Sequence, residues 1–321
     1  MKTKIIYIVI SGENDIYFEQ AWLSVWSLKN YNASAKVSLL TDSNTITIAK
    51  KTKRKNALPL FDEIITCDFN NNTNNKIRSR WLKTNMRNLV QGDFLFIDSD
   101  TIITDELTEI DNFQSNLGLV FDLNRRLKEC FQSDKIKSNI KTIFNINVPD
   151  SFDYYNSGVM YVKDVQDNYV FFDKWHKNWQ YSLQKTGKVL DQPPLFKTDI
   201  DMGGIIKPID GIYNCQILSS IKYLHSAKII HFFNIIKNDI SPFYNAALYE
   251  EIKNNGIISN SLQTLVKNCK EDIVTNCVPV KCDLWNILNC SAIDALNLFN
   301  EKYNRIFRFI NKFSNFILRY I

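Results

Sequence analysis

Phe94-Leu95-Phe96-Ile97-Asp98-Ser99-Asp100 places four apolar residues directly ahead of two carboxylates. Such a short apolar run predicts a buried strand that ends where the carboxylates begin. In an extended chain, side chains two residues apart point to the same side, so Asp98 and Asp100 can face one point. Carboxylate oxygens held in this way suit Mg²⁺ or Mn²⁺, and such an ion suits a diphosphate group. Because ligands of open α/β sheets bind beyond the carboxyl ends of the strands, the stretch indicates a metal-assisted site for a nucleotide diphosphate.

The spacing of these two aspartates is not specific by itself. Asp199-Ile200-Asp201 repeats it later in the chain. What distinguishes Asp98 and Asp100 is the apolar strand ahead of them and the apolar residues that follow. The alternative interpretation is a solvated turn at a strand end, since Asp and Ser favour turns.

Strand and helix patterns alternate through the first hundred residues. Continuous apolar strands are predicted at residues 5–10, 37–40, 63–67 and 93–97. Helical spacing follows the first strand, a basic and weakly amphipathic segment follows the second, and a helix is predicted at residues 76–90. This alternation predicts an α/β fold with a mostly parallel central sheet and helices on both faces. Continuous rather than alternating apolar strands agree with a sheet that is buried on both faces.

The second half of the chain carries further strands and a helical end. Three strands and a long aromatic helix are predicted, at residues 117–121, 155–162 and 228–232 and at residues 169–185. The pattern is helical from about Ser241 onward. We therefore expect a main body over residues 1–245 and a helical C-terminal region over residues 246–321.

The predicted helix at residues 76–90 carries a row of cations opposite its apolar side. Lys76, Arg80, Lys83 and Arg87 recur at steps of four, three and four residues. The row is either a solvated face or a cationic wall beside Asp98 and Asp100. A very short link from this helix to the fourth strand allows the second arrangement.

Composition is that of a soluble globular protein, with 45% hydrophobic and 23% charged residues in 321. No apolar stretch reaches the length of a membrane span, and residues 5–10 are too short for a signal peptide, so we expect a cytoplasmic protein. The net charge is +5, and most of it lies after residue 300, which argues against a nucleic-acid-binding domain. The seven cysteines are scattered, and Cys269, Cys277, Cys282 and Cys290 lack the close pairs of structural zinc sites, so reduced thiols are expected.

Taken in order, five segments resemble the glycosyltransferases of the GT-A fold, most closely those of glycosyltransferase family 8. That family includes glycogenin-like enzymes and bacterial lipopolysaccharide hexosyltransferases. The resemblance covers about residues 4–240. It rests on Ser79-Arg80-Trp81-Leu82-Lys83, Ile97-Asp98-Ser99-Asp100-Thr101, Tyr155-Asn156-Ser157-Gly158-Val159-Met160, Asp191-Gln192 and Lys228-Ile229-Ile230-His231-Phe232.

The resemblance implies a set of metal ligands and a donor site. Asp98, Asp100 and His231 would hold Mn²⁺ or Mg²⁺, which grips the diphosphate of a UDP-sugar. A satisfied core histidine is the alternative for His231, which stands in an apolar strand. The resemblance assigns the donor site to Ile10, Thr41, Arg80, Lys83, Asp98, Ser99, Asn156, Ser157, Gly158 and Lys237. At Lys237 the match is partial, because Asn238-Asp239 stand where the family has Pro-Trp.

The resemblance also implies the catalytic residues and the reaction. Asp191 and Gln192 would lie against the donor sugar, although Asp191 also suits a helix N-cap before Pro193. The implied enzyme moves a hexose from a UDP-sugar to a glycan or lipid-linked acceptor, with retention, in bacterial surface polysaccharide or lipopolysaccharide synthesis. Two alternatives remain: a GT-A-like sugar nucleotidyltransferase and a non-catalytic nucleotide-sugar-binding relative. The first expects a glycine-rich basic loop after the first strand, whereas residues 11–15 are acidic with one glycine.

The C-terminal end forms a basic amphipathic pattern. Apolar residues recur at alternating steps of four and three in a stripe that comprises Phe299, Tyr303, Ile306, Ile310, Phe313, Ile317 and Tyr320. Basic residues occupy much of the remaining surface. The pattern suits peripheral attachment to the inner face of the cytoplasmic membrane. Dimerisation through a coiled-coil seam or packing on the body of the protein fits the same pattern.

Overall fold

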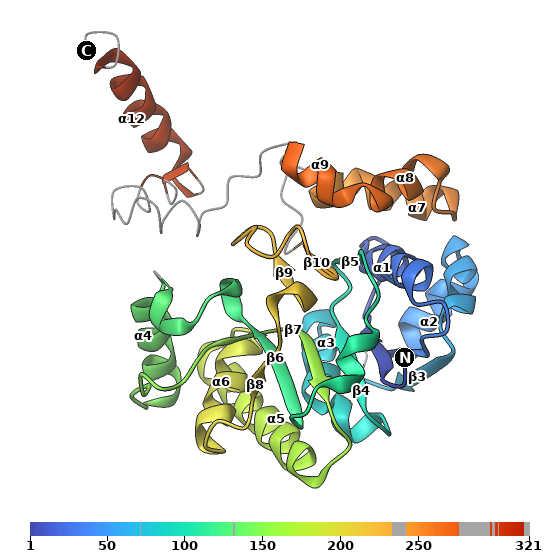
Figure 1. Cartoon of the computed structure of the whole chain (residues 1–321), viewed down its shortest axis with the longest axis horizontal. Coiled ribbons are helices and arrows are strands. Elements are labelled where there is room, and N and C mark those ends of the chain that lie inside the picture. The colour runs from blue at the N-terminus through green and yellow to red at the C-terminus, as the bar shows by residue number, and fades with distance from the viewer. Residues whose placement is uncertain are drawn as a thin grey trace.

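The computed structural model describes residues 1–70, 72–130, 132–232, 242–275, 296, 299–300 and 302–317. Its centre is a seven-stranded sheet (Figure 1). The strand order is β3-β2-β1-β4-β7-β6-β8. The strands are β1 (Lys4–Ile8), β2 (Val37–Asp42), β3 (Glu63–Cys67), β4 (Phe94–Ile97), β6 (Leu117–Phe121), β7 (Tyr155–Val162) and β8 (Lys207–Pro208). β1 to β4 run parallel, and only β7 opposes its neighbours. The mostly parallel sheet expected from the sequence is confirmed.

Alternate side chains of the sheet enter two separate apolar cores. Ile5 and Tyr7 of β1 face a core that contains α1, α2, α7 and α8. Ile6 and Ile8 face the other core, which is built from α3, α5 and α6. Helices therefore cover both faces, as a sheet of continuous apolar strands requires. The bounds are α1 (Tyr17–Tyr31), α2 (Ser43–Lys51), α3 (Asn75–Leu89), α5 (Gln166–Thr186), α6 (Gln192–Asp201), α7 (Ala246–Asn255) and α8 (Asn260–Lys267).

A second, three-stranded sheet lies beside the first and has the order β5-β10-β9. It consists of β5 (Thr101–Ile103), β9 (Cys215–Gln216) and β10 (Ile229–His231). The sequence analysis treats residues 98–100 as extended chain, which would carry Thr101, Ile102 and Ile103 onward in the direction of β4. They instead form the edge of this small sheet, because the chain bends at Ser99 and Asp100 and leaves the main sheet.

One helix is absent from the sequence prediction, and a second enters it only through the alternative interpretation of Asp191 as an N-cap. α4 (Ser133–Phe144) buries Ile140 and Ile143, and α6 starts directly after Asp191. α6 begins with Gln192-Pro193-Pro194, and Asp191 stands at its N-cap position. Proline is well suited to a first helical turn because the missing N–H has no helical partner there.

The described helices of the C-terminal region differ in how they pack. α7, α8 and α9 (Cys269–Thr275) contribute buried side chains to the core on the α1 side. α12 (Asn304–Ile317) has no buried residue, and Figure 1 shows it apart from the sheet. Among the described residues, no helix combines the length and the apolar character needed to cross a bilayer. Cys277, Cys282 and Cys290 lie outside the described residues.

Candidate active site

The candidate site lies beyond the carboxyl end of β4, where the chain passes from the main sheet to the small one. Asp98 follows β4 directly, and Asp100 precedes β5. β5 pairs antiparallel with β10 in a register that sets Thr101 opposite His231. Strand pairing thereby brings His231 next to Asp100, although 131 residues separate them along the chain.

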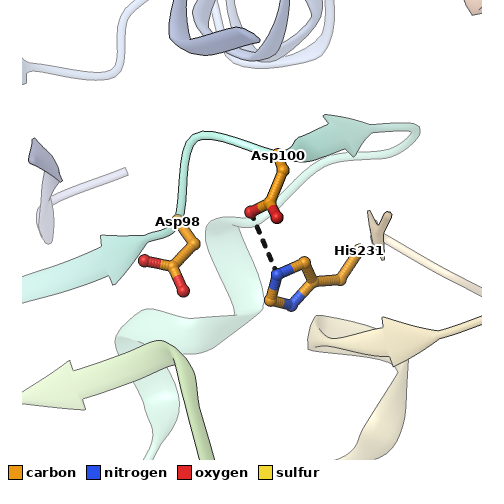
Figure 2. A group of neighbouring side chains, drawn as sticks. All are labelled: Asp98, Asp100 and His231. Atoms are coloured by element: carbon orange, nitrogen blue, oxygen red, sulfur yellow. Dashed lines mark hydrogen bonds and ion pairs between the residues drawn. The ribbon is translucent and has the colours of Figure 1, made fainter. Parts of the chain in front are cut away.

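Asp98, Asp100 and His231 have the geometry of a metal site. One ligand atom from each residue lies within 4.8 Å of the other two, and Figure 2 shows how the side chains surround a common space. His231 Nε2 is 3.1 Å from Asp100 Oδ1. The chain is bent at Ser99 and Asp100 rather than extended. The expectation that side chains two residues apart in a strand face the same side therefore does not explain why the two carboxylates lie close together. The bend and the pairing of β5 with β10 bring them together.

The charges of this group fit a divalent cation. Burial raises the pKa of Asp98, and the neighbouring charge of Asp100 raises it further, against the opposing effect of Lys83. Burial also acts to raise the pKa of Asp100, but the attraction of His231 holds that pKa below its ordinary value. Two half-buried carboxylates this close repel each other unless a cation compensates them. With two carboxylates and an imidazole, the donor set suits Mn²⁺, and Mg²⁺ through its oxygens.

His231 is buried, but it is not a histidine of an apolar core. Its side chain is 2% exposed, and both ring nitrogens face polar partners. Nδ1 lies 3.0 Å from Asn214 Oδ1, and Nε2 faces Asp100. The ring packs against Gly158, where a Cβ atom would lie 2.3 Å from His231 Cε1. Only glycine at position 158 leaves room for the ring in this orientation.

Asp191 lies beside Asp98, Asp100 and His231, which we call the metal group, and its carboxylate is negatively charged. Its carboxylate accepts a hydrogen bond from Ser157 Oγ at 2.8 Å and pairs with Arg80 and Lys83 at 3.1 and 3.2 Å. Burial acts to raise the pKa of Asp191, but Arg80 and Lys83 outweigh it and hold the pKa well below its usual range. The carboxylate makes no N-cap hydrogen bond to α6. The capping alternative fails because Pro193 and Pro194 occupy the positions whose N–H groups an N-cap would bind.

Lys83 links Asp191 to the metal group. Its ammonium lies 3.2 and 3.1 Å from the two oxygens of Asp98, and the side chain is 3% exposed. Arg80 and Lys83 thus form the cationic wall that was one interpretation of the basic row on α3. The other two members do not take part. Arg87 donates to Gly92 and Val90 at the opposite end of β4, and Lys76 is exposed.

Three polar residues of the site were missed in the sequence analysis. Asp122 follows β6 just as Asp98 follows β4, a signal that was available. Burial raises the pKa of Asp122, and hydrogen bonds from Asn156 and Gln192 oppose this rise. Asn214 and Asn124 are buried: Asn214 contacts the ring of His231, and Asn124 Nδ2 donates to the carbonyl oxygen of Asn214. Neither asparagine belongs to a strand-end pattern that marks it in the sequence.

The remaining predicted donor residues take different positions. Ile10 is buried beyond β1, and the hydroxyl of Thr41 donates to the carbonyl oxygen of Val9, which fastens β2 to the end of the first strand. Ser99 stands in the bend between Asp98 and Asp100 and is partly exposed. Gln192 Nε2 donates to the carbonyl oxygen of Tyr155 at 3.2 Å. Lys237 lies outside the described residues.

Two solved structures with a similar fold are glycosyltransferases. The bifunctional glycosyltransferase WbbM matches with a TM-score of 0.53 and 14% identity over 83% of this chain and 51% of its own length. The galactosyltransferase LgtC, solved with donor and acceptor sugar analogues, matches with a TM-score of 0.50 and 14% identity over 82% of this chain and 99% of its own. This chain therefore spans about half of WbbM and nearly all of LgtC.

These likenesses confirm the GT-A fold that the sequence motifs predicted. A scan against protein-family models and a search of curated proteins gave no match. At 12–14% identity the likeness concerns the fold, and the chemistry has to be argued from the residues of this chain.

Proposed function

We propose that this protein is a metal-dependent glycosyltransferase that moves a hexose from a UDP-sugar to a glycan or lipid-linked acceptor. The observation that carries the proposal is the group Asp98, Asp100 and His231 at the carboxyl end of β4 in a GT-A fold. Open α/β sheets bind their ligands at this edge. A bound Mn²⁺ or Mg²⁺ would supply Lewis-acid stabilisation of the charge that develops on the leaving diphosphate.

The residues around the metal group would divide the work between phosphate and sugar. Lys83 pairs with Asp98 and Asp191, and Arg80 pairs with Asp191, so two cations lie beside the metal group, where a diphosphate would need them. Asp191 is held ionised by these cations and by Ser157, so it is able to stabilise positive charge at a sugar carbon. Gln192 precedes the prolines of α6 and would orient the sugar. We expect the donor site to extend over Ile10, Thr41, Ser99, Asn156 and Gly158, and the anomeric configuration to be retained.

We further propose that residues 1–245 form the catalytic body and that the C-terminal region of residues 246–321 attaches it to the inner face of the cytoplasmic membrane. On α12 the exposed side chains include Ile306, Phe309 and Phe313, which lie on one side of the helix. Arg305, Arg308 and Lys312 fall along one flank of that side, and residues 304–317 contain no acidic residue. An apolar face with a basic flank suits an anionic lipid surface, to which each cation contributes about 1 kcal/mol. Such attachment would place the site near a lipid-linked acceptor of surface polysaccharide or lipopolysaccharide synthesis.

A donor screen tests the proposed activity. The full chain is incubated with a panel of UDP-hexoses and Mn²⁺, with and without glycolipid acceptors, and released UDP is measured. One donor should give UDP release that an acceptor stimulates, and the product anomer is then determined by NMR. If no UDP-sugar is turned over and none binds in calorimetry, the proposal is wrong. Binding without turnover would point to the non-catalytic alternative.

A further inference from the structure

A chain of buried amide groups leads from Asp122 to His231, and its hydrogen-bond directions follow from one backbone donor. The N–H of Gly158 donates to Asn156 Oδ1 at 2.9 Å, so this atom is the amide oxygen. Asn156 Nδ2 is then the donor that lies 3.0 Å from Asp122 Oδ1. Because a carboxylate only accepts, both contacts agree on the same orientation of the Asn156 amide.

The orientation of Asn156 fixes that of Asn214. Asn156 Oδ1 also lies 2.9 Å from an amide atom of Asn214, which must be the donor Nδ2. The oxygen of Asn214 therefore turns to the other side, where it lies 3.0 Å from His231 Nδ1. Asn214 is fully buried, at 0% exposure, so water does not compete for these bonds.

The orientation of Asn214 in turn decides the proton position on His231. An amide oxygen only accepts, so Nδ1 of His231 has to carry a hydrogen. Nε2 is the other ring nitrogen, and it faces Asp100 Oδ1 and the metal group. A carboxylate only accepts, so Nε2 donates a hydrogen to Asp100 Oδ1 when no cation is bound. A cation that binds between the two carboxylates would displace this hydrogen and take the Nε2 lone pair, while Nδ1 keeps its hydrogen on Asn214. An imidazole prepared in this way is a metal ligand in the correct tautomer.

We propose that Asn214 and Asn156 are positioning residues that fix His231 as the Nδ1–H form and aim its Nε2 at the cation. The inference rests on the proposed function, because it assumes that Asp98, Asp100 and His231 bind a metal ion. It adds Asn214 to the site and gives Asn156, which is already expected in the donor site, a second role through contacts that do not involve the cation. The same amide of Asn156 holds Asp122, so the network ties the metal group to a further carboxylate at the end of β6.

Substitution of Asn214 shows whether this residue positions His231 for metal binding or only stabilises the fold. Asn214→Leu keeps the size of the side chain but removes the acceptor for Nδ1–H. Loss of a partner that orients a metal-bound histidine typically lowers metal affinity about 10–100-fold. Asn168→Leu is the matched control, because Asn168 is equally buried and donates to the carbonyls of Asn116 and Lys163, away from the site. Both variants should lose stability, and only Asn214→Leu should lose Mn²⁺ affinity.

Two measurements on the full chain test the proposal without using activity. Mn²⁺ affinity is determined by EPR titration, and the Nδ1–H of His231 is sought as a slowly exchanging imidazole N–H signal by ¹⁵N NMR with saturating Mg²⁺. His231→Gln assigns this signal by its disappearance. We expect the signal in the wild type and in Asn214→Asp, which keeps an acceptor oxygen, and its loss in Asn214→Leu.

The outcomes distinguish this proposal from the proposed function. If the wild type binds Mn²⁺ and Asn214→Leu binds it equally well, the positioning role is wrong while the metal site stands. A wild type without the Nδ1–H signal would also overturn the positioning role, even if Asn214→Leu does not fold. If the wild type binds no Mn²⁺ at all, the metal-dependent function itself fails.

Discussion

Gly158→Ala adds a single methyl group at the point where β7 touches the ring of His231. The new Cβ would lie 2.3 Å from Cε1 and 2.8 Å from Nδ1 of His231, and 2.9 Å from Asn156 Oδ1. Carbon atoms pack at about 3.5–4.0 Å, so the ring has to move by about 1.2 Å or more. His231 is held by the pairing of β10 with β5 and β9, so the strand cannot easily follow.

The displacement should cost both stability and metal binding. Overpacking in a core typically costs about 1–3 kcal/mol. A 1 Å misplacement at a reacting centre can lower a rate about 100-fold. We therefore expect Gly158→Ala to unfold at lower denaturant concentration, to bind Mn²⁺ at least about 10-fold more weakly and to lose about 100-fold in turnover.

Gly118→Ala is the matched control for overpacking. Its Cβ would lie 2.5 Å from Phe113 and 2.8 Å from Ile209, in β6 of the same sheet. Urea unfolding and Mn²⁺ titration by EPR are compared for both variants and the wild type. Both should lose stability, and Gly118→Ala should keep its Mn²⁺ affinity. A Gly158→Ala protein that binds Mn²⁺ as tightly as the wild type would refute the assignment of His231 as a ligand.

Three further predictions concern Asp191, Asp199 and α12. Asp191→Asn should lower turnover about 100-fold or more with little change in Mn²⁺ affinity, because it removes the charge that would stabilise the transition state; an equal loss of both would instead make it a metal-site residue. Burial raises the pKa of Asp199 to about 6, so the free energy of unfolding should rise as the pH falls from about 6 to 4. Asp199→Asn should remove this part of the pH dependence in urea unfolding and keep the activity. The double substitution Phe309→Ser with Phe313→Ser should reduce co-sedimentation with anionic liposomes, because both side chains are exposed on α12. Truncation after about Ile293 and high salt should reduce it as well. Unchanged liposome binding together with a change in sedimentation velocity would favour a dimer helix.

The sequence predicted the parts of the site that depend on local patterns. An apolar run followed by Asp98 and Asp100 marks a strand end, and the alternation of strands and helices marks the parallel sheet. Both signals are built from the pattern of residues near one another in the chain, so no knowledge of the tertiary structure is needed. The absence of a capping hydrogen bond from α6 to the Asp191 carboxylate was also predictable, because Pro193 and Pro194 have no N–H to donate.

The remainder depends on strand pairing that the sequence does not reveal. Asn214 reaches His231 because β10 runs beside β9, and Asn156 reaches Asp122 because β7 pairs with β6. A register shift in either pair would break the amide network without altering any local pattern. The bend at Ser99 is likewise a tertiary feature, since it results from the passage of the chain between two sheets.

The central claim is that Asp98 and Asp100 bind the divalent cation on which sugar transfer depends. UDP release from the best donor is measured for the wild type, Asp98→Asn and Asp100→Asn, each with Mn²⁺ and with EDTA. Asp199→Asn serves as the control, since Asp199 belongs to the other aspartate pair of the same spacing and accepts from the backbone of Ile206. We expect EDTA to abolish activity and each site variant to lose about 100-fold or more, while Asp199→Asn stays active. Full activity of the wild type in EDTA, or of Asp98→Asn and Asp100→Asn with Mn²⁺, would contradict the claim.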